Sequence, residues 1–172
     1  MSVLLYLMRH GIAAEPTPGT NDAERALTPE GVRKTTRVAV GLQRLDVKPD
    51  VILTSPLRRA AETARLVADV LAPRAGVELY PPLAGGLPAA DVVRGLRPHR
   101  RARALFLVGH QPDLGDLASY LLTGTASLAP LPFKKAGVAA ITLGAVPPRA
   151  AGALEWFLTP SQLRAIAASR KE

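Results

Sequence analysis

The sequence contains no cysteine among its 172 residues. A disulfide framework, a thiol nucleophile and a thiolate metal site are therefore excluded. Aromatic side chains make up only 4% of the chain, too few for the stacking platforms that bind single-stranded nucleic acid. The longest apolar runs, such as residues 3–8, are far shorter than the ~20 residues that span a bilayer. We therefore expect neither nucleic acid nor a membrane as a partner.

The start of the chain shows no basic segment before its first apolar run, and charged Arg9 follows that run at once. This pattern does not fit a signal peptide. A cytoplasmic location is the expectation.

Basic residues are in excess, with 22 Lys and Arg against 14 Asp and Glu, and the net charge is +8. A positive field attracts phosphorylated metabolites, phosphoproteins and other polyanions alike. Arginine outnumbers lysine by 17 to 5, which favours planar, bidentate recognition of phosphate or carboxylate. A chain of this length with 48% hydrophobic residues predicts one folded domain over residues 1–172.

Short apolar runs alternate with longer segments of helical periodicity. Thr28-Pro29 and Thr159-Pro160 are typical helix starts, and the first helix is expected to bury Val32, Val38, Leu42 and Leu45. Strands alternating with helices predict a mostly parallel central sheet covered on both faces, a three-layer α/β/α sandwich. The expected strands are 3–8, 51–54, 77–80, 104–108, 138–143 and 154–158. The expected helices are 29–45, 56–71 with Ser55 as its cap, 90–97, 112–121 and one that begins at 160.

Polar residues follow three of the expected strands. The first runs into Arg9-His10-Gly11, the second into residues 55–59 and the fourth into Gly109-His110. Ligands of open parallel sheets bind beyond the carboxyl ends of the strands. Two arginines and two histidines are therefore expected to converge at one edge of the sheet.

This set of side chains suits phosphoryl chemistry. Arg9 and Arg59 offer fixed forks of donors to phosphoryl oxygens. A histidine held neutral can attack phosphorus and form a covalent phosphohistidine, and a second, protonated histidine can stabilise the same oxygens. Gly11 lets the backbone pass close to the phosphoryl group. This chemistry requires no metal, and the sequence offers no carboxylate cluster to hold one, so neither metal nor cofactor is expected.

Three motifs in order resemble those of the histidine phosphatase superfamily, which has the phosphoglycerate mutase-like fold. They are Leu7-Met8-Arg9-His10-Gly11, the segment 55–64 with Arg59 before Ala60, and Val108-Gly109-His110. The small size and the segments 133–143 and 156–163 are similar to the SixA-type phosphohistidine phosphatases. The resemblance implies that His10 is the nucleophile, that Arg9 and Arg59 bind the phosphoryl group, and that His110 stabilises the transition state. Gly11 and His110 are also expected among the substrate-binding residues.

The chain departs from the superfamily pattern at one position. Many members place a glutamate proton donor soon after the third strand, but Pro82 occupies that position here, and neither Glu78 nor Asp91 fits the pattern. An alkyl phosphate needs an acid to protonate its leaving alkoxide. A phosphohistidine can leave as imidazole, whose conjugate acid has a pKa of about 6.5. The absence favours phosphoramidates or activated esters as substrates, and together with the SixA-type resemblance it implies phosphohistidine on a protein.

Two alternatives stay open at this point. One is a broad phosphomonoesterase acting on small phosphorylated substrates, and the other is a non-catalytic phosphate- or polyanion-binding module. The arginine-rich stretch 94–103, which includes His99, is interpreted as a solvated face in preference to a docking site. Arg58 is interpreted as a solvent-facing helix residue. The sequence does not determine the oligomeric state.

Overall fold

The computed structural model describes residues 2–74 and 76–169, in which six strands form one sheet of order β3-β2-β4-β1-β5-β6. Strands β1 to β4 run parallel to one another, and β5 pairs antiparallel with β1 and with β6. The elements are β1 (Val3–Arg9), η1 (Asp22–Glu24), α1 (Pro29–Arg44), β2 (Val51–Thr54), α2 (Arg58–Leu71), β3 (Val77–Leu79), η2 (Pro81–Ala84), α3 (Ala89–Gly95), η3 (Arg97–His99), β4 (Ala104–Gly109), α4 (Asp113–Thr123), β5 (Val138–Leu143), β6 (Ala153–Leu158) and α5 (Pro160–Ala168).

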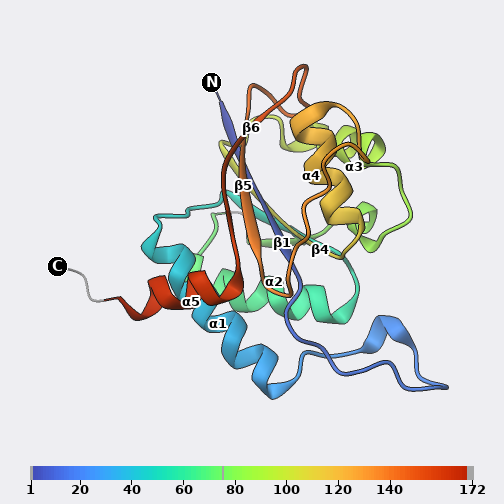
Figure 1. The fold of residues 1–172 in the computed structure, drawn as a ribbon, viewed down its shortest axis with the longest axis vertical. Helices are drawn as coiled ribbons and strands as arrows, with labels where there is room; N and C mark the ends of the chain where they lie inside the picture. The colour runs from blue at the N-terminus through green and yellow to red at the C-terminus, as the bar shows by residue number, and fades with distance from the viewer. Residues whose placement is uncertain (1, 75, 170–172) are drawn as a thin grey trace.

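Helices cover both faces of the sheet. Figure 1 shows α1, α2 and α5 on one face and α3 and α4 on the other. Side chains of a strand alternate between the two faces, so Leu5 and Leu7 of β1 pack with α3 and α4, whereas Tyr6 and Met8 pack with α1, α2 and α5. These observations confirm the α/β/α sandwich with a mostly parallel sheet.

Helix α1 begins as its sequence predicts, since the Thr28 side chain accepts a hydrogen bond from the Gly31 amide at 2.9 Å. The predicted apolar stripe is wrong at its two ends: Val32 is 39% exposed and Leu45 is 38% exposed. The buried face follows small residues instead, because α5 crosses α1 closely. A Cβ at Gly41 would lie 2.1 Å from the Leu163 carbonyl oxygen.

Two connections contain short 3-10 turns. The segment 81–90, for which neither strand nor helix was expected, includes η2, and the predicted helix 90–97 is divided into α3 and η3. The helix expected to begin at Pro56 with Ser55 as its cap begins instead at Arg58, with Leu57 at the N-cap position and no side-chain cap. The turn η1 lies in a segment for which no element was expected. Among the described residues, no helix has the length and apolar character needed to cross a membrane.

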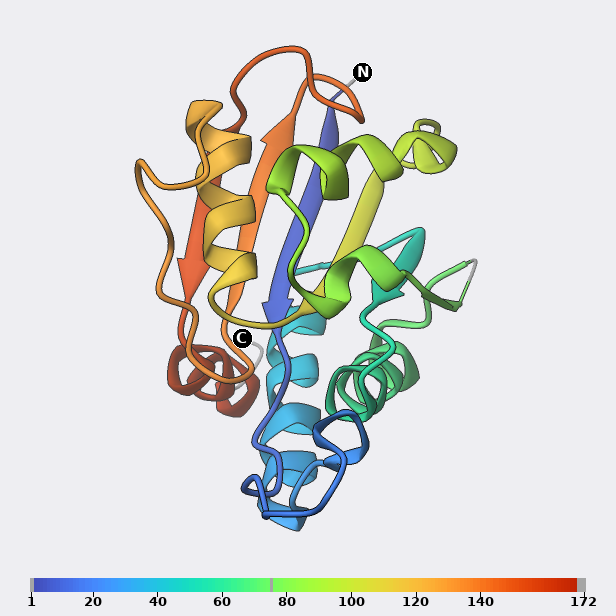
Figure 2. The same cartoon turned by 90° about the vertical axis from the view of Figure 1, so that its right-hand side faces the viewer.

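The arginine-rich stretch lies away from the carboxyl edge of the sheet. Its last residues precede β4, so they lie at the amino end of that strand (Figure 2). All five of its arginines are exposed, and Arg94 pairs with Asp91 at 2.6 Å. The exposure agrees with a solvated face.

The sheet order places the three polar strand ends side by side. Strand β4 lies between β1 and β2, with Arg9 level with Gly109 and Thr54 level with Val108. In Figure 2 the arrowheads of β1 and β4 point to the same edge of the sheet, from which the segment after β1 continues. The residues that follow these strands therefore meet at one edge.

Candidate active site

His10 is held in one orientation directly after β1. Its side chain is 7% exposed, and its Nδ1 lies 2.8 Å from the Gly11 carbonyl oxygen. Because a carbonyl oxygen only accepts, Nδ1 carries the proton in this bond, and Nε2 keeps its lone pair. The neutral ring is thereby fixed in the tautomer that a nucleophile requires.

Gly11 joins the end of β1 to α2. Its amide donates to Thr63 Oγ1 at 3.0 Å, and that hydroxyl donates to the Arg59 carbonyl oxygen at 2.7 Å. A Cβ at Gly11 would lie 2.4 Å from Thr35 Oγ1. Glycine is therefore needed at this close approach between the loop and α1.

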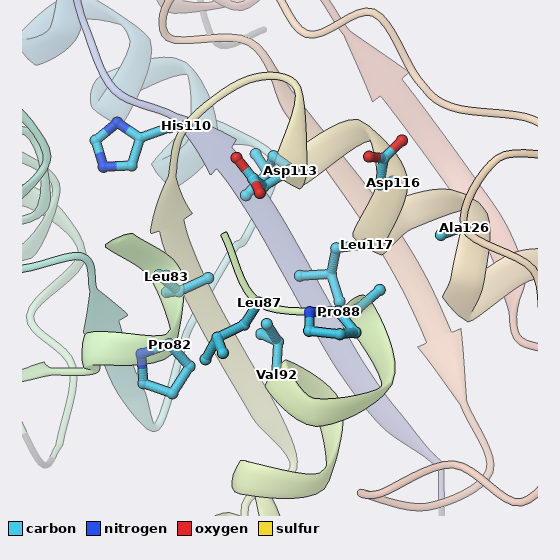
Figure 3. Close-up of a pocket in the computed structure, with 12 residues that line it drawn as sticks. Pro82, Leu83, Leu87, Pro88, Val92, His110, Asp113, Asp116, Leu117 and Ala126 are labelled. Carbon is cyan, nitrogen blue, oxygen red and sulfur yellow. The ribbon is translucent and has the colours of Figure 1, made fainter. Parts of the chain in front are cut away.

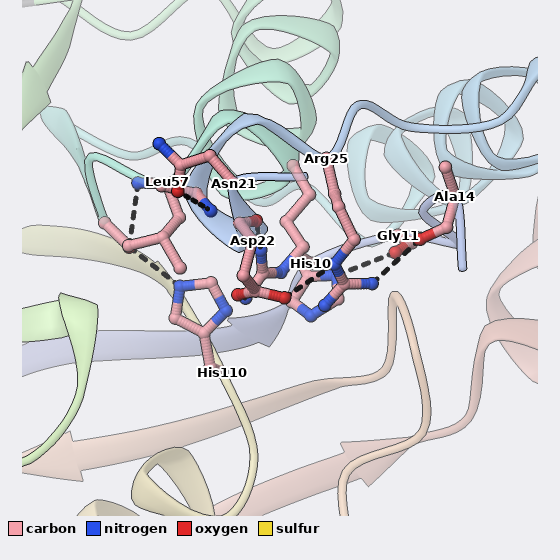
Figure 4. A network of polar contacts seen from close by, with 11 residues as sticks. His10, Gly11, Ala14, Asn21, Asp22, Arg25, Leu57 and His110 are labelled. Carbon is pink, nitrogen blue, oxygen red and sulfur yellow. Dashed lines mark hydrogen bonds and ion pairs between the residues drawn. The ribbon is translucent and has the colours of Figure 1, made fainter. Parts of the chain in front are cut away.

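His110 faces His10 from the end of β4. Their ring centroids are 5.1 Å apart. His110 Nε2 lies 2.7 Å from Ser55 Oγ, which also accepts a hydrogen bond from the Leu57 amide at 3.2 Å. His110 Nδ1 is buried and has no partner in the described part of the chain. Figure 4 shows both histidines within the polar network.

The two arginines are each anchored on one side. Arg9 Nη1 donates to the Phe133 carbonyl oxygen at 2.9 Å. Arg59 donates twice to Asp22, from Nη1 to the carbonyl oxygen at 2.9 Å and from Nη2 to Oδ2 at 3.1 Å. The Nε atoms of both arginines are buried without a partner among the described residues. Fixed guanidinium groups with unused donors are suited to an anion.

Burial and positive charge keep both histidines neutral. The pKa of His10 is lowered to about 3, mainly by burial and also by the nearby charges of Arg59 and Arg9, although the hydrogen bond to the Gly11 carbonyl acts in the opposite direction. Burial and Arg59 lower the pKa of His110 to about 4. The expectation of a protonated second histidine thus does not hold for the free site. An incoming phosphoryl anion raises the pKa of both groups.

These depressed pKa values predict that the free energy of unfolding falls as the pH drops from about 6.5 toward 4. Unfolded imidazoles take up protons in this window, whereas folded His10 and His110 do not. The folded state binds fewer protons, so acid favours unfolding, by on the order of 1 kcal/mol per histidine per pH unit. Urea unfolding of the wild type and of His110→Gln at pH 7, 6 and 5 measures this, and the variant should lose less stability. An equal fall in the free energy of unfolding for wild type and His110→Gln would contradict this prediction.

The residues interpreted as lying outside the site do lie outside it. Arg58 is exposed and pairs with Glu62 at 2.8 Å. His99 lies 3.9 Å from Glu78, while Asp91 pairs with Arg94. Among the described residues, no three His, Asp or Glu side chains are grouped as metal ligands.

Sequence reasoning missed two partners of the site. Asp22, which holds Arg59, comes from a segment without periodicity and lies 37 positions away along the chain. Ser55 belongs to the second motif, but nothing in its neighbourhood along the chain indicates a contact with His110, 55 positions later. Ser55 meets His110 because the ends of β2 and β4 lie side by side, and Asp22 reaches Arg59 through the fold of the loop after β1.

Comparison with known proteins identifies the family. The model of the histidine phosphatase superfamily (branch 1) matches residues 5–83, a segment that includes Arg9, His10, Gly11 and Arg59. An uncharacterized protein of Picosynechococcus sp. (strain PCC 7002) is 38% identical over 163 residues, which cover 91% of this chain and 95% of the relative. The similarity to that relative therefore extends well beyond residues 5–83.

The fold is also similar to solved structures. The protein histidine phosphatase SixA, solved with tungstate, superimposes with a TM-score of 0.82 and 26% identity, covering 94% of this chain and 99% of SixA. A phosphoglycerate mutase from Bacillus anthracis gives a TM-score of 0.67 and 19% identity, covering 98% and 97% of the two chains. This chain has the phosphoglycerate mutase-like fold and belongs to the histidine phosphatase superfamily of phosphatases.

Proposed function

We propose that this phosphatase hydrolyses phosphohistidine on a protein without a metal, through a covalent phosphohistidine at His10. One observation carries the proposal: a neutral histidine of fixed tautomer faces a second histidine at 5.1 Å, beside two anchored arginines. The likeness to SixA, a protein histidine phosphatase, supports this substrate.

In the first step, His10 Nε2 attacks phosphorus. The Nε2–P bond forms as the bond from phosphorus to the substrate imidazole breaks, and the leaving imidazole takes up a proton from solvent. Arg9 and Arg59 bind the equatorial oxygens through their free N–H groups. If the Ser55 hydroxyl donates to His110 Nε2, the proton of His110 lies on Nδ1, the atom left without a partner. His110 then donates to the same phosphoryl group.

In the second step, water attacks the phosphorus of phosphorylated His10. The P–Nε2 bond breaks, inorganic phosphate forms and His10 returns to its neutral state. Both leaving groups are imidazoles, so neither step depends on an enzymic acid as an alkyl ester would. Pro82, at the position where many family members have glutamate, lines a cavity beside His110. With an imidazole leaving group, the proposed reaction does not require a carboxyl group at position 82.

The test is phosphate release without added metal from a phosphohistidine peptide, para-nitrophenyl phosphate and a sugar phosphate. We expect the peptide to be preferred by wild type and to be left intact by His10→Ala. Turnover of the two esters alone would overturn the proposed substrate, and no turnover of any would favour the phosphate-binding module.

A small-molecule phosphomonoesterase is the second candidate. Its support is the fold shared with a phosphoglycerate mutase, whose name specifies a small phosphorylated metabolite. The same three substrates separate the two candidates, because a phosphomonoesterase turns over the esters. The cytoplasmic location stays a prediction.

A further inference from the structure

A cavity of about 130 Å³ adjoins the phosphoryl site and plays no part in the steps above. It lies beside His110, between η2, the loop before α3, and the first turns of α4 (Figure 3). Pockets that enclose whole small molecules have volumes of roughly 300–1,000 Å³. This cavity has the volume for one side chain next to the reacting group.

The wall of the cavity is mostly apolar. Figure 3 shows Leu83, Leu87, Pro88 and Val92 gathered on one side of it. Leu87 is 47% exposed, although most leucines of the chain are buried. An exposed apolar wall next to a reaction centre gains free energy when an apolar group of the ligand covers it.

Two carboxylates form the other side of the cavity. Asp113 and Asp116 project from the first turns of α4. Asp113 Oδ1 accepts a hydrogen bond from the Gly86 amide at 3.2 Å, and Asp116 has no hydrogen-bond or ion-pair partner within the part of the chain described. Neither carboxylate is neutralised by a described cation. The cavity is therefore negative beside a site that is positive.

This reversal of charge selects among substrates. A second phosphate or carboxylate on the substrate would be repelled here, although the chain as a whole carries +8. A cationic group near the phosphoryl group would be attracted. A suitable substrate is a polypeptide with an apolar side chain, which contacts the apolar wall, and a basic side chain, which pairs with the carboxylates, both close to its phosphohistidine.

We propose that this cavity is a specificity subsite that encloses one apolar side chain of the substrate polypeptide, while a neighbouring lysine or arginine pairs from the solvent side with Asp113 and Asp116, which are partly exposed. The inference rests on the proposed phosphohistidine phosphatase function. It makes Asp116 the main charge-selecting residue, because the Asp113 carboxylate also fixes the loop at Gly86.

The experiment compares two phosphohistidine peptides that differ only in one flanking residue, lysine or glutamate, beside a shared leucine. Wild type is expected to prefer the lysine peptide by about tenfold in kcat/KM, mainly through KM, because the contact is made equally in the ground and transition states. The preference should shrink in high salt. Asp116→Lys should abolish or reverse it.

The matched control is Asp69→Lys, which makes the same charge change on α2, in the layer across the sheet, at an exposed position. It should retain the wild-type preference. Leu87→Ser should raise KM for both peptides. Equal use of the two peptides by wild type, or an unaltered preference in Asp116→Lys, would overturn the subsite.

Phosphoramidate, which has no group to enter the cavity, separates failure of the subsite from failure of the function. Turnover of phosphoramidate without charge preference on the peptides would overturn the subsite alone. No turnover of phosphoramidate or of either peptide by wild type would overturn the proposed function. Retained phosphoramidate turnover by Asp116→Lys shows that the variant folds.

Discussion

His10→Ala is expected to reduce turnover by at least ~10⁴-fold, because it removes the atom proposed to form the covalent intermediate. Phosphate binding should stay measurable, since Arg9 and Arg59 are anchored by Phe133 and Asp22 and not by the His10 ring. Initial rates measure the first effect, and titration calorimetry with inorganic phosphate measures the second.

His99→Ala is the matched control for His10→Ala. His99 is the one histidine of the sequence that was assigned no role in the site, and it lies in η3 beside Glu78. Turnover by His99→Ala should equal that of wild type. Acid-labile, alkali-stable phosphate should be trapped on wild type and be absent from His10→Ala. Normal turnover by His10→Ala would eliminate the covalent mechanism.

Arg59→Ala is expected to reduce kcat/KM by roughly 10²–10³-fold, as the loss of a preorganised charge donor does. Arg58→Ala, one position earlier, should stay within about twofold of wild type, because its exposed side chain pairs only with Glu62 and such surface pairs contribute little. Arg59→Lys should recover only part of the loss, because lysine keeps the charge without the planar fork.

The arginine pair is compared by measuring kcat and KM for all three variants. Circular dichroism checks that each variant folds. Equal losses in Arg58→Ala and Arg59→Ala would show that the phosphoryl-binding arginine is wrongly assigned. Both residues lie in the first turn of α2, so the two alanine variants make the same change in the same element and differ only in which arginine is lost.

The strands and most helices were predictable because their signals are local. Thr159 forms its capping box with Gln162 within four residues, and the apolar run before Arg9 forms β1. Position at a strand end then indicated which side chains would converge. Val32 was assigned to the core wrongly, because the closeness of α5 to α1, which sets the buried face, has no local signal.

Contacts between distant segments could not be predicted in the same way. The bond of Asp22 to Arg59 and the approach of Ser55 to His110 depend on how loops fold over the edge of the sheet. The cavity beside His110 depends on η2 and on the Gly85–Gly86 turn, where both glycines have positive φ values of 105° and 81°. The composition of that segment indicates a turn, but it does not indicate which side chains the turn brings to the site.

The origin of the cavity wall has a consequence for how the specificity of this fold diversifies. The groups proposed to bind the phosphoryl group follow or adjoin the central strands β1, β2 and β4, whereas Leu87 and Pro88 belong to a short connection beyond edge strand β3. Surface connections accept insertions and exchanges that a packed sheet does not. Replacing the segment between residues 84 and 88 would therefore change which phosphorylated partners the protein accepts. The groups that carry out the proposed reaction would stay the same.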